Sequence, residues 1–311
     1  MKPLKEKNKM LKNIVKTKIV CLLFLASVSS YSQPFGGGSG TQQDPYQLST
    51  LEHLLELSDS VVNAHNFRDK HFILMNDITD SLRVPIGYRQ HGFSARIFRG
   101  GTFNGQGHSI NLAIEGFDTG GLFCEIANTT IMNVVINGYV REMRWGSTGG
   151  IVGKINQGGT EPSKIINCVN NAYISAVGLA GGIVGWVCNE LIIKNCINIG
   201  TIEIPNNLPF VFADRGFGGI VGLDQSFLFP LVGMGGTLSI LNSANYGFIN
   251  GGGYNTGGIL GHTVGGITLS NNFNGGVVIG NDNVGCILGF GGSNTILLNN
   301  HYDKQMCGEE D

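Results

Sequence analysis

Ionisable side chains are missing from a long stretch of this sequence. Between Gln225 and Gly280 there is no Asp, Glu, Lys or Arg. Because glycoside hydrolysis needs two carboxyl groups across the scissile bond, this stretch offers no such catalytic pair. The chain also contains no C-x-x-C pair and no G-x-S-x-G string. Zinc-ribbon sites, dithiol redox sites and the nucleophile of α/β-hydrolases are therefore excluded.

The chain starts with a basic segment that is followed by an apolar one. The segment from Met1 to Lys18 holds seven lysines and one glutamate, and the apolar run Ile19–Val28 comes next. That run is about half as long as the roughly 20 residues that a bilayer span requires. The pattern predicts a signal peptide over residues 1–32, cleaved between Ser32 and Gln33. We expect an exported chain without a membrane span, at the cell surface or extracellular, with the periplasm as the alternative.

Loss of the signal peptide changes the charge balance. It removes seven of the 20 basic and one of the 22 acidic residues, which leaves 13 against 21 and a net charge of −8. Nucleic-acid-binding proteins normally carry a basic surface, and anionic lipids attract basic segments. The mature chain therefore predicts no nucleic-acid partner and no binding to an anionic membrane surface.

A short glycine-rich string recurs along the chain. Its copy at Thr148, TGGIVG, is followed by Lys154, but the first glycine and the final Ser or Thr of a phosphate-binding loop are absent. Four further copies lack the lysine: AGGIVG at Ala180, FGGIVG at Phe217, TGGILG at Thr256 and VGCILG at Val284. Such repetition indicates an architectural element and not a nucleotide site.

Two sets of equivalent residues give the period of the repeat. The isoleucines of these strings are Ile151, Ile183, Ile220, Ile259 and Ile287. The asparagines that open the next motif are Asn167, Asn195, Asn242, Asn271 and Asn299. The shortest intervals between the two sets run from Asn167 to Ile183 and from Ile183 to Asn195, and their sum gives a minimal unit of about 28 residues. An earlier, weaker copy that begins at Thr119 makes six units.

Each unit alternates short runs of Ile, Val and Leu with turns of Gly and Asn, a pattern typical of strands. A propeller blade of four strands needs about 40–45 residues, and the intervals leave no room for a crossover helix. The sequence therefore predicts an all-β fold, a parallel β-solenoid (β-helix) of ~28-residue coils. We expect two or three short strands per coil.

Equivalent residues of successive coils should stack on each other. We expect the five isoleucines to form one buried column, and each asparagine to bond its own turn and the asparagine of the next coil. Cys168 and Cys196 occupy the same phase of consecutive units and should be neighbours. The sequence favours a stack of thiols in the core, with a disulfide as the alternative.

The segment before the repeats contains a helical pattern. Residues 48–67 predict the one helix of the chain, with Ser49 and Glu52 as a capping box and leucines 51, 54, 55 and 57 on its buried side. Residues 71–79, HFILMNDIT, predict a strand. Because the end of a solenoid exposes unpaired strand edges, we expect this helix to cap it.

Several strings occur in a fixed order: PYQLSTLEHLLELSDSV, FILMNDI, VPIGY, GTFNGQGHSINLAI, GLF and the repeated GGIVG. Together they resemble the N-terminal and repeat regions of secreted bacterial GLUG-motif proteins, over nearly all of residues 44–306. The resemblance implies a right-handed parallel β-helix, surface exposure and an adhesin-like role. In some proteases the motif is an accessory region. The string HYDKQMCGEED differs, because such proteins often continue there into further domains; a short or truncated member is the alternative.

The resulting organisation has five parts. They are a signal peptide (1–32), a flexible Gly/Ser-rich linker (33–43), an N-terminal cap with the first coil (44–118), GLUG-type β-helix repeats (119–304) and a short tail (305–311).

Two regions are candidate binding surfaces. The first has Arg89, Arg96 and Arg99 among aromatic residues, a composition that can stack on sugars and bind carboxylates. The alternative is a turn of the first coil with solvated charges. The second comprises two insertions around Ile220 that carry four aromatic residues: Phe210, Phe212, Phe227 and Phe229. We expect these loops to form a ligand-facing lip; the alternative is that the rings pack on each other.

These patterns predict a non-enzymatic, adhesin-like binding scaffold that recognises a glycan or a host or cell-surface protein. We expect no catalytic residue, no metal site and no cofactor; histidines such as His53 lack a metal-ligand spacing and are expected to cap or to face solvent. One alternative is a polysaccharide lyase or hydrolase that uses Asp118, Glu125 or Glu142. The other is a stalk fragment of a larger surface protein.

Overall fold

The computed structural model describes residues 35–63, 65, 67–88, 96–156, 161–205, 215–225, 237–252, 255–292 and 294–307. The predicted signal peptide lies outside these residues and stays a prediction. Within the described residues, no helix is both long and apolar enough to cross a membrane.

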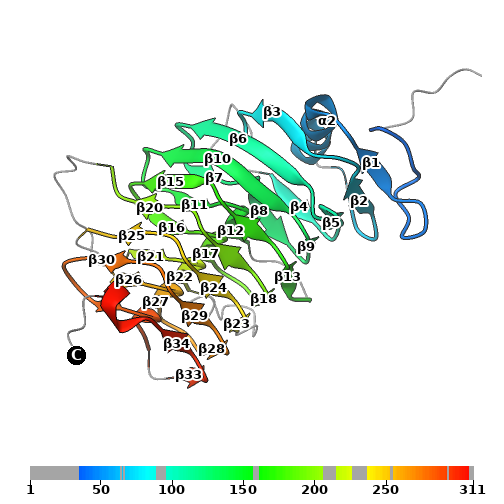
Figure 1. Ribbon diagram of the computed structural model, residues 1–311. Coiled ribbons are helices and arrows are strands. Elements are labelled where there is room, and N and C mark those ends of the chain that lie inside the picture. The colour runs from blue at the N-terminus through cyan, green and yellow to red at the C-terminus, as the bar shows by residue number, and fades with distance from the viewer. Residues whose placement is uncertain are drawn as a thin grey trace, which may run out of the picture. The chain divides into compact units, whose positions relative to one another are not determined.

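The described chain winds through four parallel sheets (Figure 1). Sheet A consists of β1 (Tyr46–Leu48), β2 (His71–Leu74), β5 (Thr102–Asn104), β9 (Thr130–Met132), β13 (Ser163–Ile166), β18 (Leu191–Lys194), β23 (Leu238–Leu241), β28 (Ile267–Ser270) and β33 (Thr295–Leu298). Sheet C consists of β4 (Ile97–Arg99), β8 (Phe123–Ala127), β12 (Val152–Ile155), β17 (Val184–Val187), β22 (Val221–Asp224), β27 (Leu260–Thr263) and β32 (Leu288–Phe290). Sheet D consists of β7 (Thr119–Gly120), β11 (Ser147–Gly149), β16 (Leu179–Gly181), β21 (Gly216–Gly218), β26 (Asn255–Gly257) and β31 (Val284–Gly285).

Sheet B begins with three longer strands and then divides into two rows. The longer strands are β3 (Ile78–Leu82), β6 (Ser109–Glu115) and β10 (Val135–Glu142). One row contains β14 (Val169–Asn170), β19 (Ile197–Asn198), β24 (Ala244–Asn245), β29 (Phe273–Asn274) and β34 (His301–Tyr302). The other contains β15 (Tyr173–Ala176), β20 (Ile202–Glu203), β25 (Ile249–Asn250) and β30 (Val278–Ile279). Strand β10 pairs with both rows, β14 at Val135 and β15 at Tyr139.

The fold is a parallel β-helix, as the sequence predicts. Neighbouring strands of successive coils pair in parallel, for example β13 with β18 and β17 with β22. Sheet D has six strands, the number of predicted units. The expected two or three strands per coil was wrong: the coil from Ser147 to Ala176 contains five, β11–β15. From β11 on, each strand ends after two to four residues, so these coils bend more often than the apolar runs suggest.

The predicted isoleucine column is confirmed. Ile151, Ile183, Ile220 and Ile259 are fully buried, and Ile287 in the last coil is 8 % exposed. Each residue of the column donates its N–H to the carbonyl of the next, over 2.9–3.2 Å. A fully buried Ile contributes about 1.5–3 kcal/mol through removal of apolar surface from water, so these coils share one continuous core.

The predicted asparagine stack is an exposed ladder on the turns between sheets A and B. Asn167, Asn195, Asn242, Asn271 and Asn299 have φ between 50° and 55°, which asparagine tolerates better than other non-glycine residues. The amide of Asn195 donates to Asn167 over 3.0 Å, and Asn242 donates to Asn195 over 3.4 Å.

A second ladder, which the sequence interpretation missed, is buried inside the coils. It consists of Asn170, Asn198, Asn245 and Asn274, all fully buried. Successive side chains are joined by Nδ2–H to Oδ1 bonds of 2.7–2.8 Å. Each amide also bonds a carbonyl two residues further along its own chain, as Asn198 does with Gly200 over 3.0 Å. The ladder satisfies polar groups that the turn would otherwise bury without a partner.

The cysteines differ partly from expectation. Cys168 and Cys196 lie on neighbouring coils, are buried and form no disulfide, so the favoured stack of thiols is confirmed. Burial raises the pKa of Cys196, and its hydrogen bond with Cys168 raises this pKa further. The disulfide of the described chain joins Cys286 to Cys307, which the repeat phase did not indicate.

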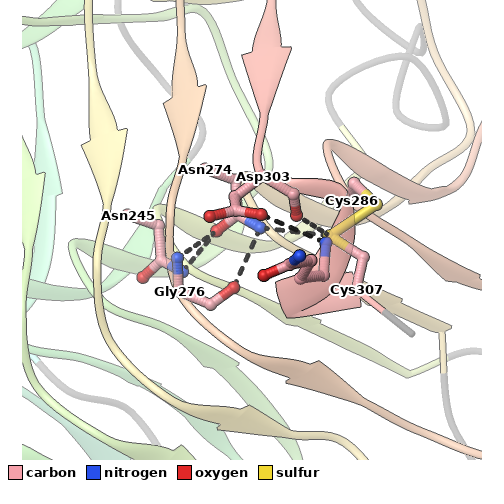
Figure 2. Close-up of a disulfide and its surroundings, with 7 residues drawn as sticks. Asn245, Asn274, Gly276, Cys286, Asp303 and Cys307 are labelled. Carbon is pink, nitrogen blue, oxygen red and sulfur yellow. Dashed lines mark hydrogen bonds between the residues drawn. A yellow bond between two sulfur atoms is a disulfide. The ribbon is translucent and has the colours of Figure 1, made fainter. Parts of the chain in front are cut away.

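Figure 2 shows this disulfide at the end of the buried ladder. Cys307 belongs to the 3₁₀ helix η2 (Lys304–Cys307), and its Sγ accepts a hydrogen bond of 3.6 Å from the amide of Asn274. Cys307 also packs against a small core that lies between sheets B and D and includes Ile249 and Val278. The disulfide thus fastens the tail over this second core.

The helix is α2 (Leu51–Val62), and its cap differs from the predicted capping box. The N-cap is Thr50 and not Ser49: the Thr50 hydroxyl accepts from the His53 N–H over 3.4 Å. The imidazole Nδ1 of His53 accepts from the Ser49 N–H over 3.0 Å, so His53 has the part predicted for Glu52.

The buried face of α2 is formed by Leu54, Leu57 and Val61, whereas Leu55 is 40 % exposed. The error at Leu55 follows from helix geometry, because residues 54, 57 and 61 share one side and 55 lies off it. Ser58 accepts a 3.2 Å bond from the Gly87 N–H and fixes α2 to the first coil. Figure 1 shows α2 at the end of the solenoid where β1–β3 lie.

The segments beside the helix also differ from expectation. Residues 71–79 contain β2 and the start of β3, because the chain turns between the two strands and the Asn76 amide bonds Ser49 O and Asp77 O. The described part of the predicted linker, residues 35–43, packs against the first coil. Gly36 donates to Gln47 O over 2.7 Å, and the Phe35 ring lies 4.9 Å from that of Tyr46.

The buried ladder gives a first prediction. We expect Asn198→Ala to lower the free energy of unfolding by about 2–3 kcal/mol, because Asn170 and Asn245 each lose a buried partner. The control is Asn195→Gly in the exposed ladder of the same coil, which keeps the positive φ and should cost less than about 1 kcal/mol. Urea unfolding followed by circular dichroism measures both. Equal losses would contradict the role assigned to the buried ladder.

The disulfide gives a second prediction. Replacing both Cys286 and Cys307 with Ser should lower the free energy of unfolding by about 3 kcal/mol, because the oxidised chain closes a loop of some 20 residues. A reducing agent should lower the free energy of unfolding of the wild-type chain by the same amount. It should leave the double variant unchanged, since Cys124, Cys168, Cys188 and Cys196 are buried and free. A reductant effect on the double variant would show that another disulfide exists.

Candidate binding surface

Most residues of the two predicted surfaces fall outside the described part of the chain. These are Arg89, Phe210, Phe212, Phe227 and Phe229. Arg96 immediately precedes β4 and Arg99 is its last residue, and both are partly buried. The Arg96 N–H donates to Gly87 O over 2.8 Å.

The aromatic residues near these arginines serve the core and not a sugar platform. Phe98 is fully buried, and its ring lies 5.2–5.3 Å from those of Phe67 and Phe123. The Tyr88 ring packs edge-on against Phe117 at 4.3 Å.

The Lys154 ammonium lies over the ring of Trp186, 4.2 Å from its centroid. The two residues are register partners on β12 and β17, and Glu125 on β8 is the neighbour of Lys154 on the other side. Glu125 accepts a hydrogen bond from the amide of Asn156. Lys154 is therefore part of an outward row of sheet C.

Glu142, another carboxylate considered for catalysis, holds a turn. It is 1 % exposed at the end of β10. One oxygen accepts from the N–H of Arg144, and the other accepts from Val177 N and Gly178 N over 3.2 and 3.1 Å. Three backbone N–H groups thus occupy most of the acceptor positions of this carboxylate. Asp118, by contrast, is exposed, and its backbone carbonyl accepts from Ser147 N over 3.0 Å.

The turn that Glu142 holds presents Trp145. This tryptophan has φ 68°, a left-handed conformation that costs a bulky residue of order 1–3 kcal/mol. It is 46 % exposed, and Met143 beside it is 68 % exposed. The turn thus keeps a large ring at the surface although its backbone conformation is unfavourable.

The guanidinium of Arg215 packs against one face of the Trp145 ring. Its Cζ lies 3.9 Å from the ring centroid, which is close enough for a cation–π interaction. Arg215 is 6 % exposed and donates from its guanidinium to Val177 O, while Asn255 donates to Arg215 O over 2.9 Å. The side chain and the backbone of Arg215 are each hydrogen-bonded, and the Trp145 ring packs on the guanidinium.

The strand that precedes this turn carries an aromatic and charged row on the outer face of sheet B. The Arg141 guanidinium lies 4.7 Å from the Tyr139 ring centroid and binds the Glu115 carboxylate over 2.8 Å. On the next coils, the Tyr173 hydroxyl donates to Glu203 over 2.6 Å. Burial, followed by this hydrogen bond, raises the pKa of Tyr173.

Together, the Trp145 turn and this row form the surface that we call the Trp145 shelf: Tyr139, Arg141, Met143, Arg144 and Trp145 with Arg215 beneath. A fixed, exposed indole can stack on the apolar face of a sugar ring, and neighbouring guanidinium groups can donate to hydroxyl or carboxylate oxygens. Among the described residues, no group of three or more His, Cys, Asp or Glu side chains could hold a metal ion.

Sequence reasoning missed the shelf, although two signals were present. The strand registers place Arg215 at the position that Gly146 and Gly178 occupy in the two preceding coils. A buried arginine at a glycine position marks a local departure from the repeat. Trp145 is also one of only two tryptophans in the chain.

No family model matches this chain, and no curated protein matches it. A similar solved structure is the crystal structure of a putative immunoglobulin A1 protease from Bacteroides ovatus. The two chains are 18 % identical, the match covers 86 % of this chain and 87 % of that one, and the TM-score is 0.50. This likeness concerns the fold alone.

The contacts of Glu142 separate a structural role from a catalytic one. We expect Glu142→Ala to lower the free energy of unfolding by about 2–4 kcal/mol, because three backbone N–H groups lose their acceptor. The exposed Glu115, paired with Arg141, is the control, and Glu115→Ala should cost about 1 kcal/mol or less. Thermal unfolding of both variants tests this. A Glu142 variant of unchanged stability would contradict the role in the turn.

Proposed function

We propose that this protein is an exported, non-catalytic scaffold of the cell surface or extracellular space that binds glycans through the Trp145 shelf. The observation that carries the proposal is the exposed Trp145 ring, held in a strained turn on the buried Arg215. A ring that is ordered before binding loses little conformational entropy when a ligand stacks on it.

Three features support export and surface exposure. The first is the basic and apolar start of the chain. The second is the disulfide between Cys286 and Cys307, because disulfides persist in oxidising compartments. The third is the parallel β-helix itself, which offers long outer faces for recognition.

The carboxylates argue for binding rather than glycan cleavage. Glu142 is engaged by three backbone donors, and Glu125 and Glu115 have partners in Asn156 and Arg141. A glycosidase needs two carboxyl groups on either side of one bond. Strand register places Glu125 on sheet C and Glu142 on sheet B, in separate sheets of the coil.

The name of the Bacteroides ovatus structure brings proteolysis into consideration as a further activity. The described residues include an Asp–His pair, with 3.4 Å between His108 Nδ1 and Asp77 Oδ1. The neighbouring Ser109 donates its backbone N–H to the same Asp77 oxygen over 2.8 Å. A catalytic triad instead requires a hydroxyl that bonds the imidazole, so these contacts favour a structural role between β3 and β6.

The proposal is tested with the purified mature chain on an array of neutral and uronate-containing polysaccharides. We expect Trp145→Ala to weaken binding to the preferred glycan at least about tenfold, which corresponds to ~1.4 kcal/mol. Arg215→Met should weaken it less, because the indole remains but its support is lost. The matched control is Tyr246→Ala, which removes another aromatic residue, 53 % exposed, far along the chain and should leave affinity unchanged.

Two results would contradict the proposal. One is the absence of binding to any glycan while the chain still attaches to enzymatically deglycosylated cells, which would indicate a protein ligand. The other is turnover of a polysaccharide or of immunoglobulin A by the wild-type chain. Circular dichroism of each variant establishes that a loss of binding is not a loss of fold.

A further inference from the structure

A row of polar side chains crosses sheet B at Arg141, a residue of the Trp145 shelf. Glu115, Arg141, Ser175 and Glu203 are register partners on β6, β10, β15 and β20. Figure 1 shows these four strands side by side. Because neighbouring strands lie 4.7–4.9 Å apart, the row from Glu115 to Glu203 is about 14 Å long. It is therefore longer than a single sugar ring.

Arg141 within this row is held by three neighbours. Its guanidinium lies over the rings of Tyr139 and Tyr173, 4.7 and 5.8 Å from their centroids. It also donates to the Glu115 carboxylate over 2.8 Å. The Arg141 side chain is nevertheless 51 % exposed. Since a guanidinium has five N–H donors, Arg141 keeps donors for a ligand after its bond to Glu115.

The two ends of the row are carboxylates that can still accept hydrogen bonds. Glu115 is 53 % exposed, and Glu203 is partly exposed. Glu115 accepts from Arg141, and Glu203 accepts from the Tyr173 hydroxyl over 2.6 Å. An ionised carboxylate has about four lone-pair positions, and these contacts occupy one on each. The row thus offers acceptors at its ends and donors between them.

The charges around the shelf do not add up to a positive surface. The guanidinium groups are those of Arg141, Arg144 and Arg215. The carboxylates on the same or neighbouring coils are those of Glu115, Asp118, Glu142 and Glu203. Three positive charges against four negative ones leave a local charge of −1. A polymer that carries carboxylates gains no net attraction from such a surface.

We propose that the ligand of the Trp145 shelf is a neutral polysaccharide, with one sugar stacked on Trp145 and further sugars along the row from Glu115 to Glu203. The proposal rests on the proposed function and names its substrate class. A sugar hydroxyl can donate to Glu115 or Glu203 and accept from Arg141. The carboxylate of a uronate can only accept, and at either end of the row it would face a like charge.

The test compares polysaccharides in matched neutral and carboxylated forms by isothermal titration calorimetry of the full mature chain. The pairs are dextran with carboxymethyl-dextran, xylan with carboxymethyl-xylan, and methyl-esterified with free polygalacturonate. A glycan that the array identifies is added as a further pair after carboxymethylation or carboxyl reduction. In about 0.1 M salt we expect the neutral form of the best-bound pair to bind at least about tenfold more tightly. The preference should shrink in about 1 M salt, because the Debye length falls from about 10 Å to about 3 Å.

Two variants test whether the row causes this preference. Glu115→Gln and Glu203→Gln each remove a negative charge and keep an acceptor oxygen. Each should raise the affinity for the carboxylated form at least about threefold in low salt, because a like charge is lost. The matched control is Asp59→Asn, which makes the same charge change at an exposed residue of α2 and should leave the preference unchanged. Circular dichroism checks the fold of each variant, and Glu203→Gln carries the test where Glu115→Gln does not fold.

The outcomes separate this proposal from the proposed function. Equal or tighter binding of the carboxylated form overturns the neutral substrate class, while a loss of that binding in Trp145→Ala would leave glycan binding by the shelf standing. A preference for the neutral form that neither salt nor the two variants change also overturns the proposal, because the row then has no part in it. A chain that binds no form of any polysaccharide overturns the proposed function and this proposal with it.

Discussion

The contact on which the repeated coils depend is the one between the buried asparagine ladder and the second glycine of the strings that begin at Thr148, Ala180, Phe217 and Thr256. A Cβ on Gly150, Gly182, Gly219 or Gly258 would overlap the side chain of Asn170, Asn198, Asn245 or Asn274, respectively. The glycine leaves the space in which the amide can lie flat and bond both its own turn and the next coil. Removal of either partner would leave a buried polar group unsatisfied or force the coils apart. Packing therefore requires the glycine in each of these coils. It does not require Lys154, which explains why the glycine recurs and the lysine does not.

The period and the fold class could be predicted because inward residues must match from coil to coil. The strand count could not, since Gly and Asn turns divide each apolar run into pieces shorter than a periodicity can reveal. The buried ladder was not predicted, because Asn167 and Asn170 belong to the same string and only their φ angles and burial distinguish an outer from an inner amide.

The disulfide was not predicted for a related reason. Cys168 and Cys196 occupy equivalent positions in consecutive coils, but side chains at equivalent positions point in the same direction and not toward each other. Cys286 and Cys307 have no common phase and meet only because η2 folds back.

The candidate site was harder to predict, because outward residues other than the exposed asparagine ladder follow no repeat. A column of isoleucines constrains the next isoleucine, whereas the outer face of a strand tolerates many residues. The arginine and aromatic segment around Arg96 attracted attention by composition, yet Phe98 is needed in the aromatic core under α2. Composition does not distinguish a ring that faces solvent from one that faces the core. Arg215 was the better signal: it occupies a glycine position, and a departure at such a position requires a compensating contact, which Trp145 provides.

The repeated interior of the solenoid also explains how a residue on its variable outer surface can be held in a defined position. The positive φ of Trp145 is unfavourable by itself. It is offset by the three hydrogen bonds of Glu142 and by the stacking of Arg215, and both residues are anchored to Val177 or its neighbour on the following coil. The interior columns hold that coil in register with the turn. The position of the indole is thus set by the repeat, although the residues that form the shelf do not repeat, and a single coil without its neighbours could not hold the ring in place.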